Sequence, residues 1–110
     1  MSNEATIKAM LVHCRKIQTY SEGLDYRQFI ASPMATEACV FNLLQLGEMV
    51  AKIDDAFIEQ NPQIPWKAMK GMRHRLVHNY EGVDLEIVWG AIKNEVPGLA
   101  DKLKKLFQDV

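Results

Sequence analysis

Apolar side chains recur along this chain at alternating intervals of three and four residues, the spacing of one face of an α-helix. Two long stretches show it, the first with Ile7, Met10, Leu11, Cys14 and Ile17, and the second with Cys39, Leu43, Leu46, Val50, Ile53 and Phe57. No segment shows the period of two that marks a half-buried strand. The spacing therefore predicts an all-α fold whose helices pack through these apolar stripes.

Proline and glycine set the ends of the first three predicted helices. Glu22–Gly23 ends the first helix, and residues 24–31 predict a short second one. Ser32–Pro33 begins the third, because serine caps a helix and proline fits its first position. This helix is expected to end near Glu59, because Pro62 cannot continue it.

The second half of the chain predicts further helices with short connections. Pro65 begins a fourth helix, expected to run to Tyr80 and to end at Asn79–Gly82. Asp84 can cap a fifth, and Pro97–Gly98 is expected to separate it from a final amphipathic segment. Short connections favour antiparallel neighbours, so we expect an antiparallel helical bundle.

Length and composition narrow the class of protein. A chain of 110 residues suits a single domain, residues 1–110. The net charge of −1 gives no overall attraction to nucleic acid. The polar start resembles no signal peptide, and no apolar run approaches the roughly 20 residues of a membrane span, so we expect a cytoplasmic protein without membrane contact. Cys14 and Cys39 lie within apolar stripes and are expected to be buried and reduced.

The segment Met72–Tyr80 concentrates the side chains that can perform chemistry. Arg73 can hold a phosphate through its planar fork of donors, and His78 can exchange a proton near neutral pH. Asn79 and Tyr80 add an amide and a hydroxyl, although each also suits the end of a helix. Cleavage of a phosphodiester requires both charge neutralisation and proton transfer, so these residues predict a site that acts on phosphodiesters.

A basic segment precedes and includes this site. Residues 60–80 contain no acidic side chain, whereas Lys67, Lys70, Arg73 and Arg75 carry positive charges and His74 lies among them. We interpret Lys67, Lys70, His74 and Arg75 as candidates for contact with nucleic-acid phosphates. The alternative is an ordinary solvated helix face whose charges are balanced by neighbours in space.

Helix geometry raises a question about Arg73 and His78. At about 100° per residue, Arg73 and Tyr80 share a face of one helix, whereas His78 lies about 140° from Arg73. Either the helix unwinds around His78, or two copies of the segment meet across a two-fold axis. The sequence leaves both arrangements open.

A metal site is the other chemistry that two histidines suggest. His74 and His78 are four residues apart, but the glutamate of a His-Glu-x-x-His zinc site is missing between them. A third ligand would have to come from His13 or Glu81, and no spacing supports either. We therefore predict neither a metal nor another cofactor.

The pattern Arg-x-x-x-x-His-x-Tyr, read at Arg73, His78 and Tyr80, resembles the signature of the HEPN superfamily, and within it the HepT-like toxin ribonucleases. Residues 42–48 (Asn-Leu-Leu-Gln-Leu-Gly-Glu) resemble the central helix of that family. The segments 64–73 and 83–89, which flank the motif, are also similar, so the resemblance covers about residues 36–103. Phe41 is a departure, because relatives commonly carry arginine there.

The resemblance implies a homodimeric HEPN-type bundle and a metal-independent endoribonuclease whose composite site uses Arg73 and His78 at the dimer interface. It also implies a toxin opposed by a nucleotidyltransferase antitoxin that adenylylates Tyr80. Asn79 would support catalysis. The alternative is a non-catalytic module that only docks such a transferase.

Overall fold

The computed structural model describes residues 2–78 and 82–108, with only the backbone given for His78 and Gln108. Within those ranges the chain forms eight helices and one two-stranded hairpin. Their bounds are α1 Asn3–Ser21, α2 Tyr26–Ile30, α3 Pro33–Val50, α4 Asp55–Gln60, α5 Trp66–Lys70, α6 Met72–Leu76, β1 Val77–His78, β2 Gly82–Val83, α7 Leu85–Asn94 and α8 Val96–Gln108.

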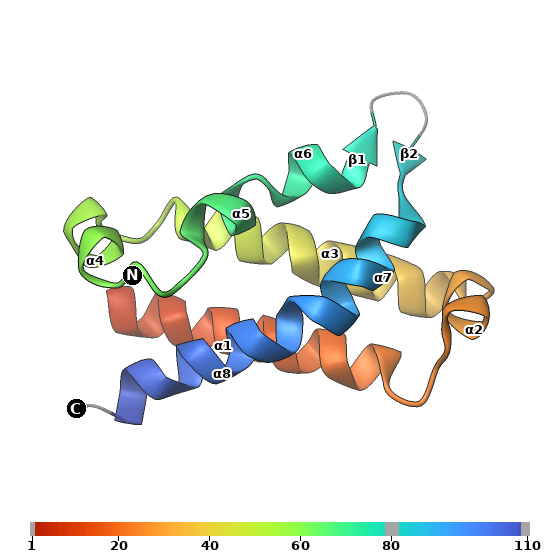
Figure 1. Cartoon of the computed structure of the whole chain (residues 1–110), viewed down its shortest axis with the longest axis horizontal. Coiled ribbons are helices and arrows are strands. Elements are labelled where there is room, and N and C mark those ends of the chain that lie inside the picture. Colours follow the sequence, from red (N-terminus) through yellow and green to blue (C-terminus); the bar gives the residue numbers. More distant parts are fainter. Residues whose placement is uncertain (1, 79–81, 109–110) are drawn as a thin grey trace.

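The helices run back and forth along the long axis of the molecule (Figure 1). The chain passes in one direction through α1, returns through α3, turns again through α5 and α6, and returns through α7 and α8. Helix α1 packs mainly on α3 and α8, while α3 also carries α5 and α6. The predicted all-α antiparallel bundle is therefore confirmed.

The core contains most of the residues that the apolar spacing selected, although Phe57 is only partly buried. Ile7, Met10, Cys14 and Ile17 of α1 are buried, as are Cys39, Leu43, Leu46 and Val50 of α3. No helix in the described part of the chain is long and apolar enough to cross a membrane.

The predicted third helix is wrong beyond Val50. Helix α3 ends there, and a separate α4 begins at Asp55. The side chain of Asn3 holds the start of α4, because its oxygen accepts from the Asp54 backbone N–H at 3.1 Å and its amide donates to the Asp54 carboxylate at 3.2 Å. Ile53 is nevertheless buried. The apolar spacing therefore identified it correctly as a core residue, although it lies beyond the end of α3.

The predicted fourth helix is also wrong, both in continuity and in its end. Residues 66–76 form two five-residue helices that meet at Gly71, and the backbone becomes extended at Val77. The hairpin that follows pairs Val77 with Val83 and His78 with Gly82. Gly82 has a φ of +83°, which favours glycine, so it serves a hairpin rather than the predicted helix end.

The last break lies slightly before its predicted position. Asp84 caps α7 as predicted, accepting from the backbone N–H groups of Glu86 and Ile87 at 3.1 and 3.2 Å. Helix α7 ends at Asn94, and α8 begins at Val96 rather than after Pro97–Gly98. Proline is tolerated there because the first turn of a helix leaves its N–H groups without helical partners.

Candidate functional site

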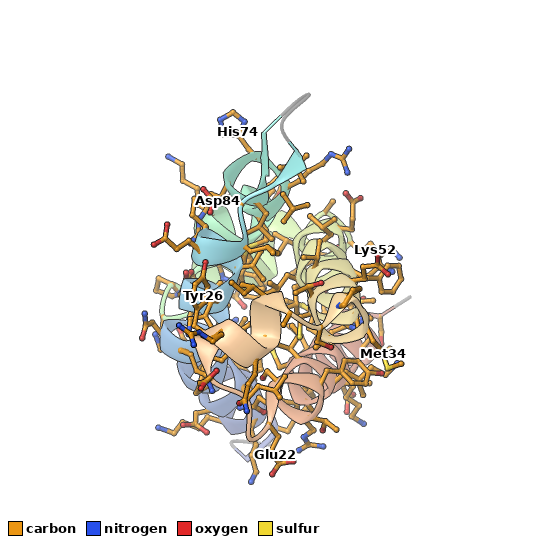
Figure 2. The ribbon with its side chains drawn as sticks, turned by 90° about the vertical axis from the view of Figure 1, so that its right-hand side faces the viewer. Glu22, Tyr26, Met34, Lys52, His74 and Asp84 are labelled. Atoms are coloured by element: carbon orange, nitrogen blue, oxygen red, sulfur yellow. The ribbon has the colours of Figure 1, made fainter. Side chains whose placement is uncertain are left out.

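Helices α5 and α6 present a buried side and a basic side. The buried side consists of Trp66, Met69, Met72 and Leu76, each at most 6% exposed. The opposite side consists of the exposed residues Lys67, Lys70, Arg73 and His74, which we call the basic strip. Figure 2 shows His74 on the outer surface, at the edge where the hairpin lies. The apolar anchors thus fix both short helices and leave the basic strip in water.

A glycine of α3 allows α5 to approach closely. A Cβ atom on Gly47 would lie 2.6 Å from the backbone carbonyl oxygen of Met69 and 3.5 Å from Met72 Cβ. Real Cβ atoms essentially never approach an atom as closely as the first of these distances. Gly47 therefore sets the depth at which the helices of the basic strip are seated.

The hairpin begins immediately after α6 and is closed by a backbone bond. The N–H of Asp84 donates to the carbonyl of Leu76 at 2.9 Å, outside the helical pattern. That bond supplies a partner for a carbonyl at the helix end, where no intrahelical N–H is available. The pairing of β1 with β2 and this backbone bond therefore replace the last helical turn that the spacing of residues 72–80 predicted.

The predicted catalytic residues lie on either side of this transition. Arg73 is exposed on α6, and the backbone of His78 lies in β1. Because the helix ends at Leu76, the angle of about 140° calculated for a straight helix does not apply to this pair. Asn79 and Tyr80 lie outside the described residues, as does the side chain of His78.

Arg75 occupies a different environment from the basic strip. Its Nη1 and Nη2 atoms donate to Oε1 and Oε2 of Glu95 at 3.0 and 2.6 Å. The hydrogen bond with Glu95 raises the pKa of Arg75 above its ordinary value. The guanidinium that was predicted to contact phosphate is therefore paired with a carboxylate between α7 and α8.

An apolar groove lies beside the hairpin, with a volume of about 330 Å³. We call it the hairpin groove, and it is lined by Thr36, Glu37, Val40, Phe41, Leu44, Val83 and Leu85. Phe41 is 59% exposed and Val83 is 39% exposed. Val83 is the β2 partner of Val77, so the groove directly adjoins the strand that contains His78.

The two cysteines are unsuited to nucleophilic catalysis. Both are buried and free, as predicted. Burial raises the pKa of Cys14 to about 12 and that of Cys39 to about 11, so neither thiol ionises near neutral pH.

The third histidine, His13, is engaged between α1 and α3. Its Nδ1 lies 2.7 Å from Oδ1 of Asn42, whose amide donates to the Ala38 carbonyl at 2.7 Å. The Asn42 oxygen therefore accepts and His13 Nδ1 donates. Among the described residues, no group of three potential metal-ligating side chains lies close together.

Two features of the site were not predicted from the sequence. Glu95 lies 20 residues from Arg75, and no local spacing links them. Val83 was expected before a helix rather than in a strand. The one available signal was Gly82, because glycine readily adopts the positive φ that hairpin turns require.

Comparisons with known proteins agree on one family. A family model described as "Ribonuclease HepT-like" matches residues 10–106. "Putative RNase TTE0752" of Caldanaerobacter subterraneus subsp. tengcongensis is 32% identical, covering 93% of this chain and 91% of the relative. "Putative RNase MJ0125" of Methanocaldococcus jannaschii is 33% identical, covering 97% and 92% respectively.

A further relative carries the family's own name. "Probable ribonuclease HepT" of Thermococcus cleftensis is 31% identical, covering 82% of each chain. No solved structure matches the chain significantly. The family model extends well beyond the motif, from within α1 to within α8, so the likeness concerns most of the fold. The chain belongs to the HepT-like ribonuclease family of HEPN proteins.

Proposed function

We propose that this protein is the toxin of a toxin–antitoxin pair and acts as a metal-independent endoribonuclease. One observation carries the proposal: the basic strip follows α5 and α6 to the strand that contains His78. Exposed cations of this kind neutralise nucleic-acid phosphates. Membership of a ribonuclease family supports RNA as the substrate.

The proposed chemistry uses the 2′-hydroxyl of RNA as the nucleophile. His78 removes its proton, and the oxygen attacks the adjacent phosphorus while the bond to the 5′-oxygen breaks. His78 of the same or the second copy protonates that leaving oxygen. Arg73 neutralises the charge that develops on the phosphate oxygens, and Asn79 supports the reaction.

The hairpin groove supports a composite site in a homodimer. Phe41 and Val83 expose apolar surface that a second copy can cover. A two-fold interface uses the same patch on both copies. Because the groove adjoins β1, covering it with a second copy brings both His78-containing strands to one interface, where Arg73 and His78 of the two copies combine.

Adenylylation of Tyr80 is the proposed means of neutralisation. Tyr80 is two residues past His78, at the end of the basic segment. A nucleotide transferred to its hydroxyl by a cognate nucleotidyltransferase adds a phosphate that competes with RNA for Arg73. The base and ribose also obstruct the site sterically.

Cleavage of defined RNAs by the purified protein, with a chelator present, tests the activity. We expect products that end in a 2′,3′-cyclic phosphate, and no cutting where a 2′-deoxynucleotide precedes the scissile bond. His78→Ala and Arg73→Ala should be inactive, and Arg73→Lys should recover little because lysine lacks the fork. Arg15→Ala is the matched control, because Arg15 is exposed on α1.

A second experiment separates cleavage from control by the partner. Incubation with ATP, magnesium and the cognate transferase should add adenylate at Tyr80 and stop cleavage. Tyr80→Phe should resist modification, whereas Tyr20→Phe, at an exposed tyrosine of α1, should not. Unaltered cleavage by His78→Ala would exclude His78 as the acid and base. RNA binding by the wild type without any cleavage would favour the alternative of a non-catalytic docking module.

A further inference from the structure

The Arg75–Glu95 pair connects the motif helix to a distant part of the chain. Both guanidinium donors meet both carboxylate oxygens, at 3.0 and 2.6 Å. This bidentate geometry restricts the orientation of both side chains more than a single contact would. The pair therefore joins α6 to the junction between α7 and α8, at Glu95.

Helix α6 needs such a connection because it cannot maintain itself. It has five residues and no side-chain hydrogen bond at its N-terminus. Isolated helices of that length are not stable in water, so tertiary contacts must hold it. Met72 and Leu76 hold its buried side. Arg75 provides the corresponding polar contact toward α7 and α8, which fixes the rotation of the helix about its axis.

That rotation determines where the proposed catalytic groups lie. Arg73 is two residues before Arg75 on the same short helix, and β1 begins two residues after it. A small rotation of α6 would shift the Arg73 guanidinium and the start of the His78 strand together. The pair itself is partly exposed, with side chains 34% and 43% accessible. Exposed pairs add little to global stability, so losing this one should alter α6 more than the whole fold.

We propose that Arg75 is a positioning residue, which holds α6 in place through Glu95 and so aligns Arg73 and His78, rather than a residue that contacts RNA. This inference rests on the proposed ribonuclease function. It gives Glu95 a role that neither the motif nor the basic strip indicates. It also separates Arg75 from Lys67, Lys70 and His74, whose exposed side chains remain the proposed phosphate contacts.

Steady-state cleavage by Arg75→Gln, Glu95→Gln and the reversed pair Arg75→Glu/Glu95→Arg tests the proposal. Each single variant should lower kcat by roughly tenfold, because small misplacements of reacting groups are costly, while KM changes by less than about threefold. The reversed pair should recover most of the lost kcat. Glu86→Gln is the matched control, since it removes an exposed glutamate of α7 and should leave kcat unchanged.

The two roles of Arg75 predict different results. If Arg75 instead binds RNA, Arg75→Gln raises KM, Glu95→Gln releases the arginine and improves binding, and the reversed pair stays defective. Any of those three results overturns the proposal. Wild-type kcat in both single variants overturns it as well.

Hydrogen exchange distinguishes failure of this proposal from failure of the ribonuclease function. In Glu95→Gln, the amides of α6 should exchange faster while those of α1 and α3 keep their protection. Unchanged exchange in α6 overturns the positioning role whether or not the protein cleaves RNA. If the wild type proves inactive, the proposed function fails, and faster exchange in α6 still supports Glu95 as the residue that holds this helix.

Discussion

Replacing Gly47 by alanine should test how closely the helices of the basic strip are seated on α3. The added Cβ would lie 2.6 Å from the Met69 carbonyl oxygen, whereas ordinary contacts begin near 3.4 Å. The obstructing atom belongs to the backbone of α5 and cannot turn aside as a flexible side chain would. Either α5 moves outward by somewhat less than an ångström, or α3 bends.

Two opposing effects set the magnitude. Alanine is favoured over glycine inside a helix by about 1 kcal/mol. Overpacking a core contact typically costs about 1–3 kcal/mol, and occasionally more. A contact with rigid backbone belongs at the upper end of that range, so Gly47→Ala should lower the free energy of unfolding by about 2 kcal/mol. For a domain of this size, that is a decrease in Tm of about 8 °C.

Gly90 provides the matched control. It lies within α7, and a Cβ there would meet no atom within 4 Å. Gly90→Ala should therefore raise the free energy of unfolding by up to about 1 kcal/mol through helix propensity alone. Urea titrations followed by circular dichroism would measure the free energy of unfolding of both variants. An unchanged m-value, the slope of that free energy against urea concentration, would show that the comparison is valid.

The same substitution should also affect the proposed activity. Displacement of α5 moves Gly71 and with it α6, so Gly47→Ala should cleave RNA more slowly than Gly90→Ala at a temperature where both are folded. If Gly47→Ala proved as stable as the wild type, the close approach of α3 and α5 would not be a packing constraint, and the reasoning would fail.

Three other outcomes follow from particular residues. Phe41→Glu should convert the proposed dimer into monomers in light scattering, whereas Val12→Glu, at a residue 47% exposed on α1, should not. Gly82→Ala should lower stability by about 1–2 kcal/mol and reduce cleavage, because it places a side chain at a φ of +83° in the hairpin. Burial raises the pKa of Cys14 and Cys39 above the ordinary 9.0, so unfolded thiols ionise first and the free energy of unfolding should decrease as the pH rises above 9. Cys14→Ala should weaken that pH dependence in denaturant titrations, and an unchanged slope would contradict the assigned burial.

Features that depend on local spacing and local chemistry could be predicted from the sequence. The three-and-four interval of Ile7, Met10 and Cys14 identified the buried side of α1, because a helix repeats its faces at that period whatever lies opposite. Ser32 and Asp84 marked helix starts, because a capping side chain bonds backbone N–H groups within three residues of itself. The motif residues Arg73 and His78 were likewise recognisable from order and type, and so was the family.

The positions at which helices end and the charged residues that form pairs depend on contacts between segments far apart in the sequence. Val77 suits the apolar spacing of a helix, yet Val83 pairs with it and the Asp84 N–H bonds the Leu76 carbonyl, so the chain leaves the helix there. In the sequence Arg75 resembles its basic neighbours, but in the structure its guanidinium bonds Glu95, which lies 20 residues away. Such outcomes depend on competition between a local hydrogen bond and a distant one of similar strength. The packing of α3, α6 and α7 settles that competition, and sequence spacing within one segment does not encode it.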